Sequence, residues 1–167
     1  MAKLTAAKIN KLNREFDKKK KIYILADNDE VDISIKFKES IINEIVMEYL
    51  EVIGKLSQVT NLDNKKVMGT LGVLNLLILR EFSNVPMIPK DTSNIYDTID
   101  ITLALLDCGV MGAVIKEFDG AEIKKVYDKL EEMGKAMSDP LVEAAIKSAL
   151  NASKQEQEHV EVDSNEL

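Results

Sequence analysis

The chain has 167 residues, 46% of them hydrophobic, so it can bury one sizeable core and is too short for two ordinary domains. Lys and Arg total 22 against 29 Asp and Glu, and the formal net charge of -7 argues against nucleic acid and anionic lipid as partners of the whole molecule. The single cysteine, Cys108, excludes an intramolecular disulfide, and with no secretory pattern at the amino terminus we expect a cytoplasmic protein.

The first segment is basic. Residues 1–21 carry eight basic and two acidic side chains, a local charge of +6 that leaves -13 for the remainder. Thr5 is a suitable N-cap for an amphipathic helix over about residues 5–18. Its apolar positions are Leu4, Ile9, Leu12 and Phe16. We expect this arm to be a solvated helix that complements the acidic body of the same fold, and phosphate binding is the alternative.

The pattern then changes to a period of two in KIYILADNDEVDISIKF, residues 21–37, which predicts a β-hairpin. With Asn28 and Asp29 as a two-residue turn, Ile24 pairs with Ile33 and the apolar side chains share one face. A lone hairpin is marginal in water, so that face must pack against helices or another subunit. DNDEVD lacks the glycine and the alternating ligands of a calcium loop, and we interpret it as a solvated turn.

Two helices are predicted next. Ser40 is the expected N-cap of the first, whose broad apolar stripe ends at Ile53 before the polar stretch that starts at Gly54. The second, VMGTLGVLNLLILREF, carries no charge before Arg80. Its uncharged part is about 20 Å long as a helix, whereas a bilayer needs about 20 residues.

This segment, residues 67–82, is therefore predicted to be the central buried helix of a bundle. Gly69 and Gly72 weaken it by about 1 kcal/mol each relative to alanine, which suggests the close approach of a neighbouring backbone.

The remainder is helical up to a polar tail. Two prolines mark residues 83–93 as a loop, and an apolar stripe then runs from Ile95 to a stop near Gly109. Further helices are expected over residues 110–118, after a capping box of Asp119 and Glu122, and after Ser138 or Asp139 with Pro140 in the first turn. Residues 151–167 carry five acids against one lysine and are predicted to be disordered.

The predicted fold class is α+β and mostly α-helical: a helical bundle around a central apolar helix with one N-terminal β-hairpin. Residues 1–150 form a single domain in this prediction.

No residue pattern favours catalysis. The sole histidine, His159, lies in the predicted tail, and Cys108 is interpreted as a small buried side chain. Asp97 and Asp100 are interpreted as surface charges, because no metal-binding histidine or second acidic pair accompanies them. Phosphate-binding glycine motifs are absent. We therefore expect no enzyme, no cofactor and no metal.

Four stretches carry a family resemblance, over roughly residues 4–137. They are KINKLNREFDKKKKI, VDISIKFKESIINEIVMEYLEV, LLILREFSNVPMIP and ITLALLDCGVMGAVIKEFDGAEIKKVYDKLEEM. In these stretches the chain resembles the tail assembly chaperones of long-tailed bacteriophages of Gram-positive bacteria.

The resemblance implies a non-enzymatic protein that binds the phage tape measure protein. It would keep this long helical client soluble while the tail tube polymerises around it, in the host cell cytoplasm, and would be absent from the mature virion. The family implies a second partner, the tail tube protein, recruited through a longer frameshifted form. Homo-oligomers are also possible.

The client-binding surface is predicted at Met133, Met137, Leu141, Ile146 and Leu150, because flexible apolar side chains suit the binding of apolar helices. The other interpretation is that these residues close the core. For the whole protein, the alternative function is a helical regulator or adaptor that binds nucleic acid through its basic N-terminal arm.

Overall fold

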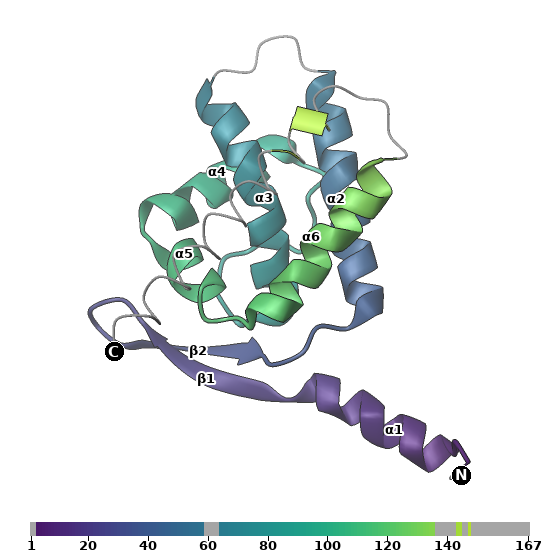
Figure 1. Cartoon of the computed structure of the whole chain (residues 1–167). Coiled ribbons are helices and arrows are strands. Elements are labelled where there is room, and N and C mark those ends of the chain that lie inside the picture. The colour runs from purple at the N-terminus through teal and green to yellow at the C-terminus, as the bar shows by residue number, and fades with distance from the viewer. Residues whose placement is uncertain (1–2, 59–63, 136–142, 145–146, 148–167) are drawn as a thin grey trace, which may run out of the picture.

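The computed structural model describes residues 3–58, 64–135, 143–144 and 147 (Figure 1). Its elements are α1 (Ala6–Arg14), η1 (Glu15–Asp17), β1 (Lys19–Ile24), β2 (Asp29–Ser34), α2 (Glu39–Ser57), α3 (Asn64–Phe82), α4 (Ile95–Asp107), α5 (Val110–Ile115) and α6 (Gly120–Gly134). The predicted class, α+β and mostly helical with one hairpin, is confirmed. None of the described helices combines the length and apolar character that a membrane crossing requires.

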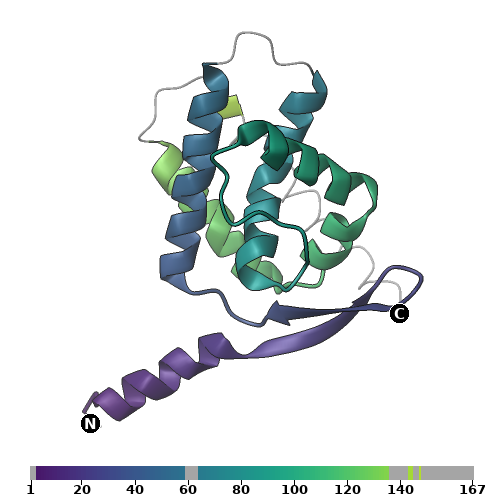
Figure 2. The same cartoon turned by 180° about the vertical axis from the view of Figure 1, so that it is seen from behind.

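Helix α3 is the centre of the bundle, as predicted. It packs against α2, α4 and α5, and α6 lies against α2 (Figures 1 and 2). Its fully buried side chains are Val73, Leu74, Leu76, Leu77, Ile78 and Leu79. Because each such side chain contributes about 1.5–3 kcal/mol when it leaves water, this helix is a main source of the fold's stability.

The hairpin has the predicted buried face but a different register. Ile24 pairs with Asp29, four residues from its predicted partner, and Ile22 pairs with Val31. The turn is longer than predicted because Leu25 and Asn28 both adopt positive φ, at 60° and 56°, with the amide of Asn28 donating to the Leu25 carbonyl. A shift by an even number of residues keeps every side chain on its own face.

The buried face of the hairpin packs on the helices. It consists of Ile22, Ile24, Val31 and Ile33. The chain just after α3 holds the outer edge of β2: Ser83 bridges to Ile33, and the Asn84 side-chain oxygen accepts a 2.8 Å hydrogen bond from the Asp32 amide. DNDEVD forms the turn and the start of β2, as expected for a solvated turn.

Helix α2 differs from the prediction at both ends. Its N-cap is Lys38, whose extended backbone precedes the first turn, and Ser40 lies exposed inside the helix. At the other end the helix continues through Gly54 to Ser57, because the apolar stripe goes on to a buried Leu56. The hydrophobic face therefore outweighs the weak helix propensity of one glycine.

Phe37 joins the hairpin to two helices. Its ring stacks on Phe82 at a centroid distance of 3.7 Å and meets Phe118 edge-on at 5.2 Å. Its backbone amide donates a 2.9 Å hydrogen bond to the buried carboxylate of Glu122 on α6. One half of the predicted capping box is therefore confirmed, because Asp119 caps α6 by accepting from the Ala121 amide. The other half is wrong, because the Glu122 carboxylate binds the Phe37 amide and not the start of its own helix.

Two further predictions concern the contact of α3 with α4 and the end of α4. The close approach at Gly69 and Gly72 comes from α4 side chains and not from a neighbouring backbone. Cys108 is exposed, against the prediction, because it is the C-cap of α4 and the chain turns away at Gly109 with a φ of 78°. The predicted surface position of Asp97 and Asp100, both exposed on α4, is confirmed.

The buried side chain of Tyr49 allows a first test of the packing in the core. Its hydroxyl is fully buried and has no hydrogen-bond partner among the described residues, and burial raises its pKa far above the usual range. An unpaired buried hydroxyl costs free energy. We expect Tyr49→Phe to raise the free energy of unfolding by about 1 kcal/mol in urea denaturation.

The matched control is Tyr127→Phe, because the Tyr127 hydroxyl donates to the Asn75 side-chain oxygen at 3.4 Å. We expect this variant to lose about 0.5–1 kcal/mol. A destabilised Tyr49→Phe variant would mean that the hydroxyl is bonded after all.

Candidate functional site

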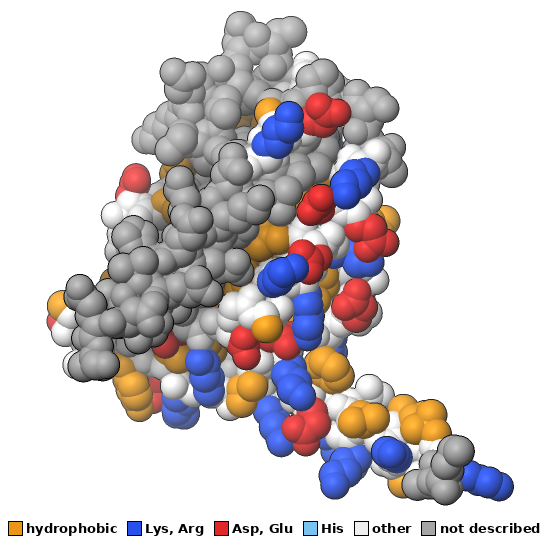
Figure 3. All heavy atoms as spheres, in the orientation of Figure 1, with side chains coloured by type: hydrophobic (Ala, Val, Ile, Leu, Met, Phe, Trp, Pro, Cys, Tyr) orange, Lys and Arg blue, Asp and Glu red, His pale blue; other side chains and the backbone are white. Residues whose placement is uncertain are grey.

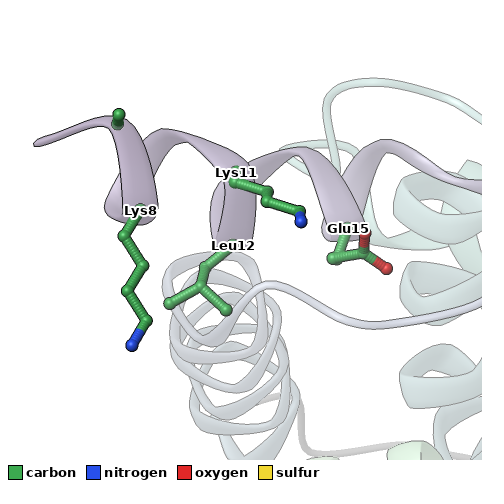
Figure 4. A pocket seen from close by; sticks show the side chains of 5 residues that line it. Lys8, Lys11, Leu12 and Glu15 are labelled. Atoms are coloured by element: carbon green, nitrogen blue, oxygen red, sulfur yellow. The ribbon is translucent and has the colours of Figure 1, made fainter. Parts of the chain in front are cut away.

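The described residues contain no cluster of three or more His, Cys, Asp or Glu side chains that could hold a metal ion. His159 lies outside the described residues. What the described chain does present is a shallow hollow along α1 and η1, shown in Figure 4. Its lining residues are Ala7, Lys8, Lys11, Leu12 and Glu15. They all come from one short segment, so the hollow is the open surface of a helix.

Helix α1 forms where the sequence predicts it. The Thr5 hydroxyl accepts a 3.3 Å hydrogen bond from the Lys8 amide and caps the first turn. The helix nevertheless buries none of its residues. Figures 1 and 2 show it pointing away from the bundle, joined to it through β1. The expectation that it complements the acidic body of the same chain is therefore not met.

The apolar face of this arm is open to solvent. Leu4, Ile9 and Leu12 are 69%, 45% and 55% exposed. Figure 4 shows Lys8 and Leu12 projecting to the same side of the helix. We define the α1 arm as residues 3–17, with Leu4, Ile9 and Leu12 as its apolar face. Ile9 and Leu12 are three residues apart and therefore lie on one side of the helix, and an exposed apolar patch is typical of a surface that meets a partner.

The basic side chains of α1 are also free of ion pairs with the described residues. Lys8, Lys11 and Arg14 form no ion pair within the described part of the chain. Figure 3 shows the resulting mixture of apolar and basic side chains on the projecting arm. Acidic partners appear only in η1, where Lys18 pairs with Glu15 at 2.7 Å and holds the pKa of that carboxyl below its usual range.

The base of the arm is tied to the bundle. Asp17 accepts a 2.8 Å hydrogen bond from Lys38, just before α2. Surface pairs of this kind contribute little to stability. This one nevertheless connects the arm to the start of the bundle.

Of the five residues predicted to bind the client, the structure describes one. Met133 lies on α6, half-buried and packed against the core. Met137, Leu141, Ile146 and Leu150 lie outside the described residues, so the surface stays a prediction. From the sequence, the basic side chains of the arm are an alternative site for phosphate or nucleic acid, but the spacing of its apolar residues does not show that they are exposed.

A family model described as YomO matches residues 6–163. The chain belongs to the YomO family. YomO is a phage-type protein, which agrees with the phage character of the resemblance drawn from the sequence. The YomO match includes α1, the hairpin and every helix of the bundle, so it covers the projecting arm from Ala6 onwards. No curated protein matches the chain, and no solved structure does.

Proposed function

We propose that the chain is a phage tail assembly chaperone that binds the tape measure protein. In this proposal it keeps the client soluble and promotes polymerisation of the tail tube around it. It acts in the host cell cytoplasm without catalysing a reaction, and it leaves before the virion matures. The observation that carries the proposal is the α1 arm. Its apolar side chains are exposed, and it projects from a helical bundle whose surface is highly charged (Figures 1 and 3).

A long helical client exposes apolar side chains along one face of each helix. A helix with an unpaired apolar stripe is shielded when a second amphipathic helix lies along it. The α1 arm offers such a face, and its short length keeps each contact weak enough for release. The acidic remainder of the chain keeps a loaded complex soluble through mutual repulsion.

The tail tube protein is the second partner in this proposal, bound through a longer frameshifted form of the chaperone. Delivery of the tube subunit to the client would then need both forms in one complex. The phage-type family supports this setting only in general terms.

The decisive test is co-expression with the tape measure protein of the same phage. We expect Ile9→Gln combined with Leu12→Gln to lower the soluble fraction of the client about tenfold, because two apolar contacts are lost while the helix propensity is kept. The matched control is Met47→Gln with Met87→Gln, which removes two side chains that are 61% and 81% exposed outside the arm. Soluble client can be measured by centrifugation and immunoblotting.

The predicted C-terminal surface needs its own variant, with its five apolar residues changed to glutamine. If that variant alone releases the client, the binding face is C-terminal and not on the arm. If neither variant changes client solubility, the proposed function is wrong.

The alternative function has one observation in its favour, the unpaired basic side chains of the arm. Lys8, Lys11 and Arg14 lie within one short helix and form no ion pair in the described chain. An adaptor that used them on nucleic acid would show retention on DNA that falls steeply with salt. Retention at about 150 mM salt that disappears in Lys8→Gln with Lys11→Gln would favour this alternative.

A further inference from the structure

We propose that a second copy of this chain covers the α1 arm, with the basic side of α1 against the acidic outer face of α4. Two copies would shield each other's arms in this way. The expectation that a client displaces the second copy rests on the proposed function, whereas the pairing of the two copies does not.

The arm needs a partner to be stable. Helix α1 has nine residues, and isolated helices shorter than about 12–15 residues are marginal in water. None of its residues is buried, and Leu4, Ile9 and Leu12 remain open to solvent. A protein that carries such a face without covering it risks aggregation.

The acidic counterpart is α4. Its buried side chains Thr98, Ile99 and Thr102 face the bundle. Asp97, Asp100, Ala104 and Asp107 are exposed on the other side. Between Lys90 and Lys116 the sequence has no lysine or arginine. None of these aspartates forms an ion pair in the described chain, and Asp97 accepts a 2.6 Å hydrogen bond from the side-chain amide of Asn94. We call Asp97, Asp100, Ala104 and Asp107 the acidic face of α4.

The two helices match in charge and in spacing. Lys8 and Lys11 are three residues apart, as are Asp97 and Asp100, and both spacings are about 4.5 Å along a helix. Half-buried Ile101 adjoins the acidic face and leaves an apolar edge beside it. The pairing thus joins uncompensated charges of opposite sign.

The arm does not reach α4 of its own chain. Figures 1 and 2 both place α1 and α4 at opposite ends of the molecule. Contact between two α1 arms is disfavoured because it would bring like charges together. Many acids of α2 and α6 are already occupied, as in Glu51 with Lys55 and Asp128 with Lys124. The acidic face of α4 in a second copy joins three aspartates on one helix face that form no ion pair in the described chain, and it is the surface that we propose.

The test is the mass of the full chain in solution, by sedimentation equilibrium over a range of concentrations. We expect a dimer of twice 18.7 kDa, which weakens as salt is raised. Lys8→Glu with Lys11→Glu is expected to weaken the dimer about 100-fold, and so is Asp97→Lys with Asp100→Lys. The variant that combines all four changes restores opposite charges and should recover to within about tenfold of the original affinity.

The control is Lys116→Glu with Lys135→Glu, which reverses two exposed lysines outside the arm and outside α4 and should leave the dimer unchanged. All substituted side chains are exposed, and circular dichroism verifies that the variants fold. A chain that is monomeric at every concentration, or a combined variant that fails to recover, overturns the pairing. A monomer that still keeps the client soluble overturns this pairing alone, whereas a charge-dependent dimer that leaves the client insoluble overturns the proposed function alone.

Discussion

Replacing Gly69 and Gly72 together by alanine is expected to lower the free energy of unfolding by about 2 kcal/mol. A Cβ on Gly69 would lie 2.6 Å from the Cγ2 of Ile99, and one on Gly72 would lie 2.6 Å from the Cγ2 of Thr102. Both distances are far inside van der Waals contact, so α3 and α4 would have to separate. Overpacking of about 2 kcal/mol at each site outweighs the gain in helix propensity of about 1 kcal/mol.

The neighbouring side chains are not free to move away. Ile99 and Thr102 are buried and β-branched, which restricts their rotamers in a helix. The Thr102 hydroxyl also donates a 2.8 Å hydrogen bond to the Thr98 carbonyl, which fixes the direction of its methyl group.

The matched control is Gly54→Ala in α2, where an added Cβ would meet nothing within 4 Å. This variant is expected to gain about 1 kcal/mol from helix propensity alone. Urea denaturation of the three proteins gives the comparison. If the double variant were as stable as the parent, the tight packing of α4 on the glycines of α3 would be wrong.

Periodicity predicted the parts of the fold that depend on burial. The apolar stripe of α2 and the uncharged residues of α3 from Val73 to Leu79 lie mostly in the core, because a chain of this length can bury a hydrophobic helix face only against its other elements. The hairpin register was not predictable in the same way. Any even shift keeps Ile22 and Ile24 on the buried face, and the choice was made by the positive φ values of Leu25 and Asn28.

Side-chain contacts between residues far apart in the chain could not be predicted from the sequence either. Glu122 has the spacing of a capping box, yet its carboxylate accepts from the amide of Phe37, 85 positions away. A local pattern cannot reveal a competing donor that arrives through the tertiary fold. The same limit applies to α1, whose amphipathic pattern predicts a helix but does not show whether its apolar face is covered by the chain itself.

Arg80→Ala is expected to lower the free energy of unfolding by about 3 kcal/mol. The Arg80 side chain is 12% exposed, and its Nη1 and Nη2 atoms donate to the two carboxylate oxygens of Glu48 at 2.9 and 2.6 Å. Glu48 also accepts from the Thr92 hydroxyl at 2.6 Å, so the arginine connects α3 to α2 and to the loop before α4. Removing it leaves a largely covered carboxylate without its cation.

The control is Lys124→Ala, which breaks an exposed pair with Asp128 at 2.6 Å and should cost about 0.5 kcal/mol or less.

The loss of stability in Arg80→Ala should also depend on pH. Hydrogen bonds from Arg80 hold the pKa of Glu48 below its ordinary value of 4.5, so the pair stabilises the fold fully above that pH. As the pH falls through the lowered pKa, Glu48 is protonated and the parent protein should approach the variant in stability. A constant difference down to acid pH, or a loss as small as that of Lys124→Ala, would show that the pair does not join these elements.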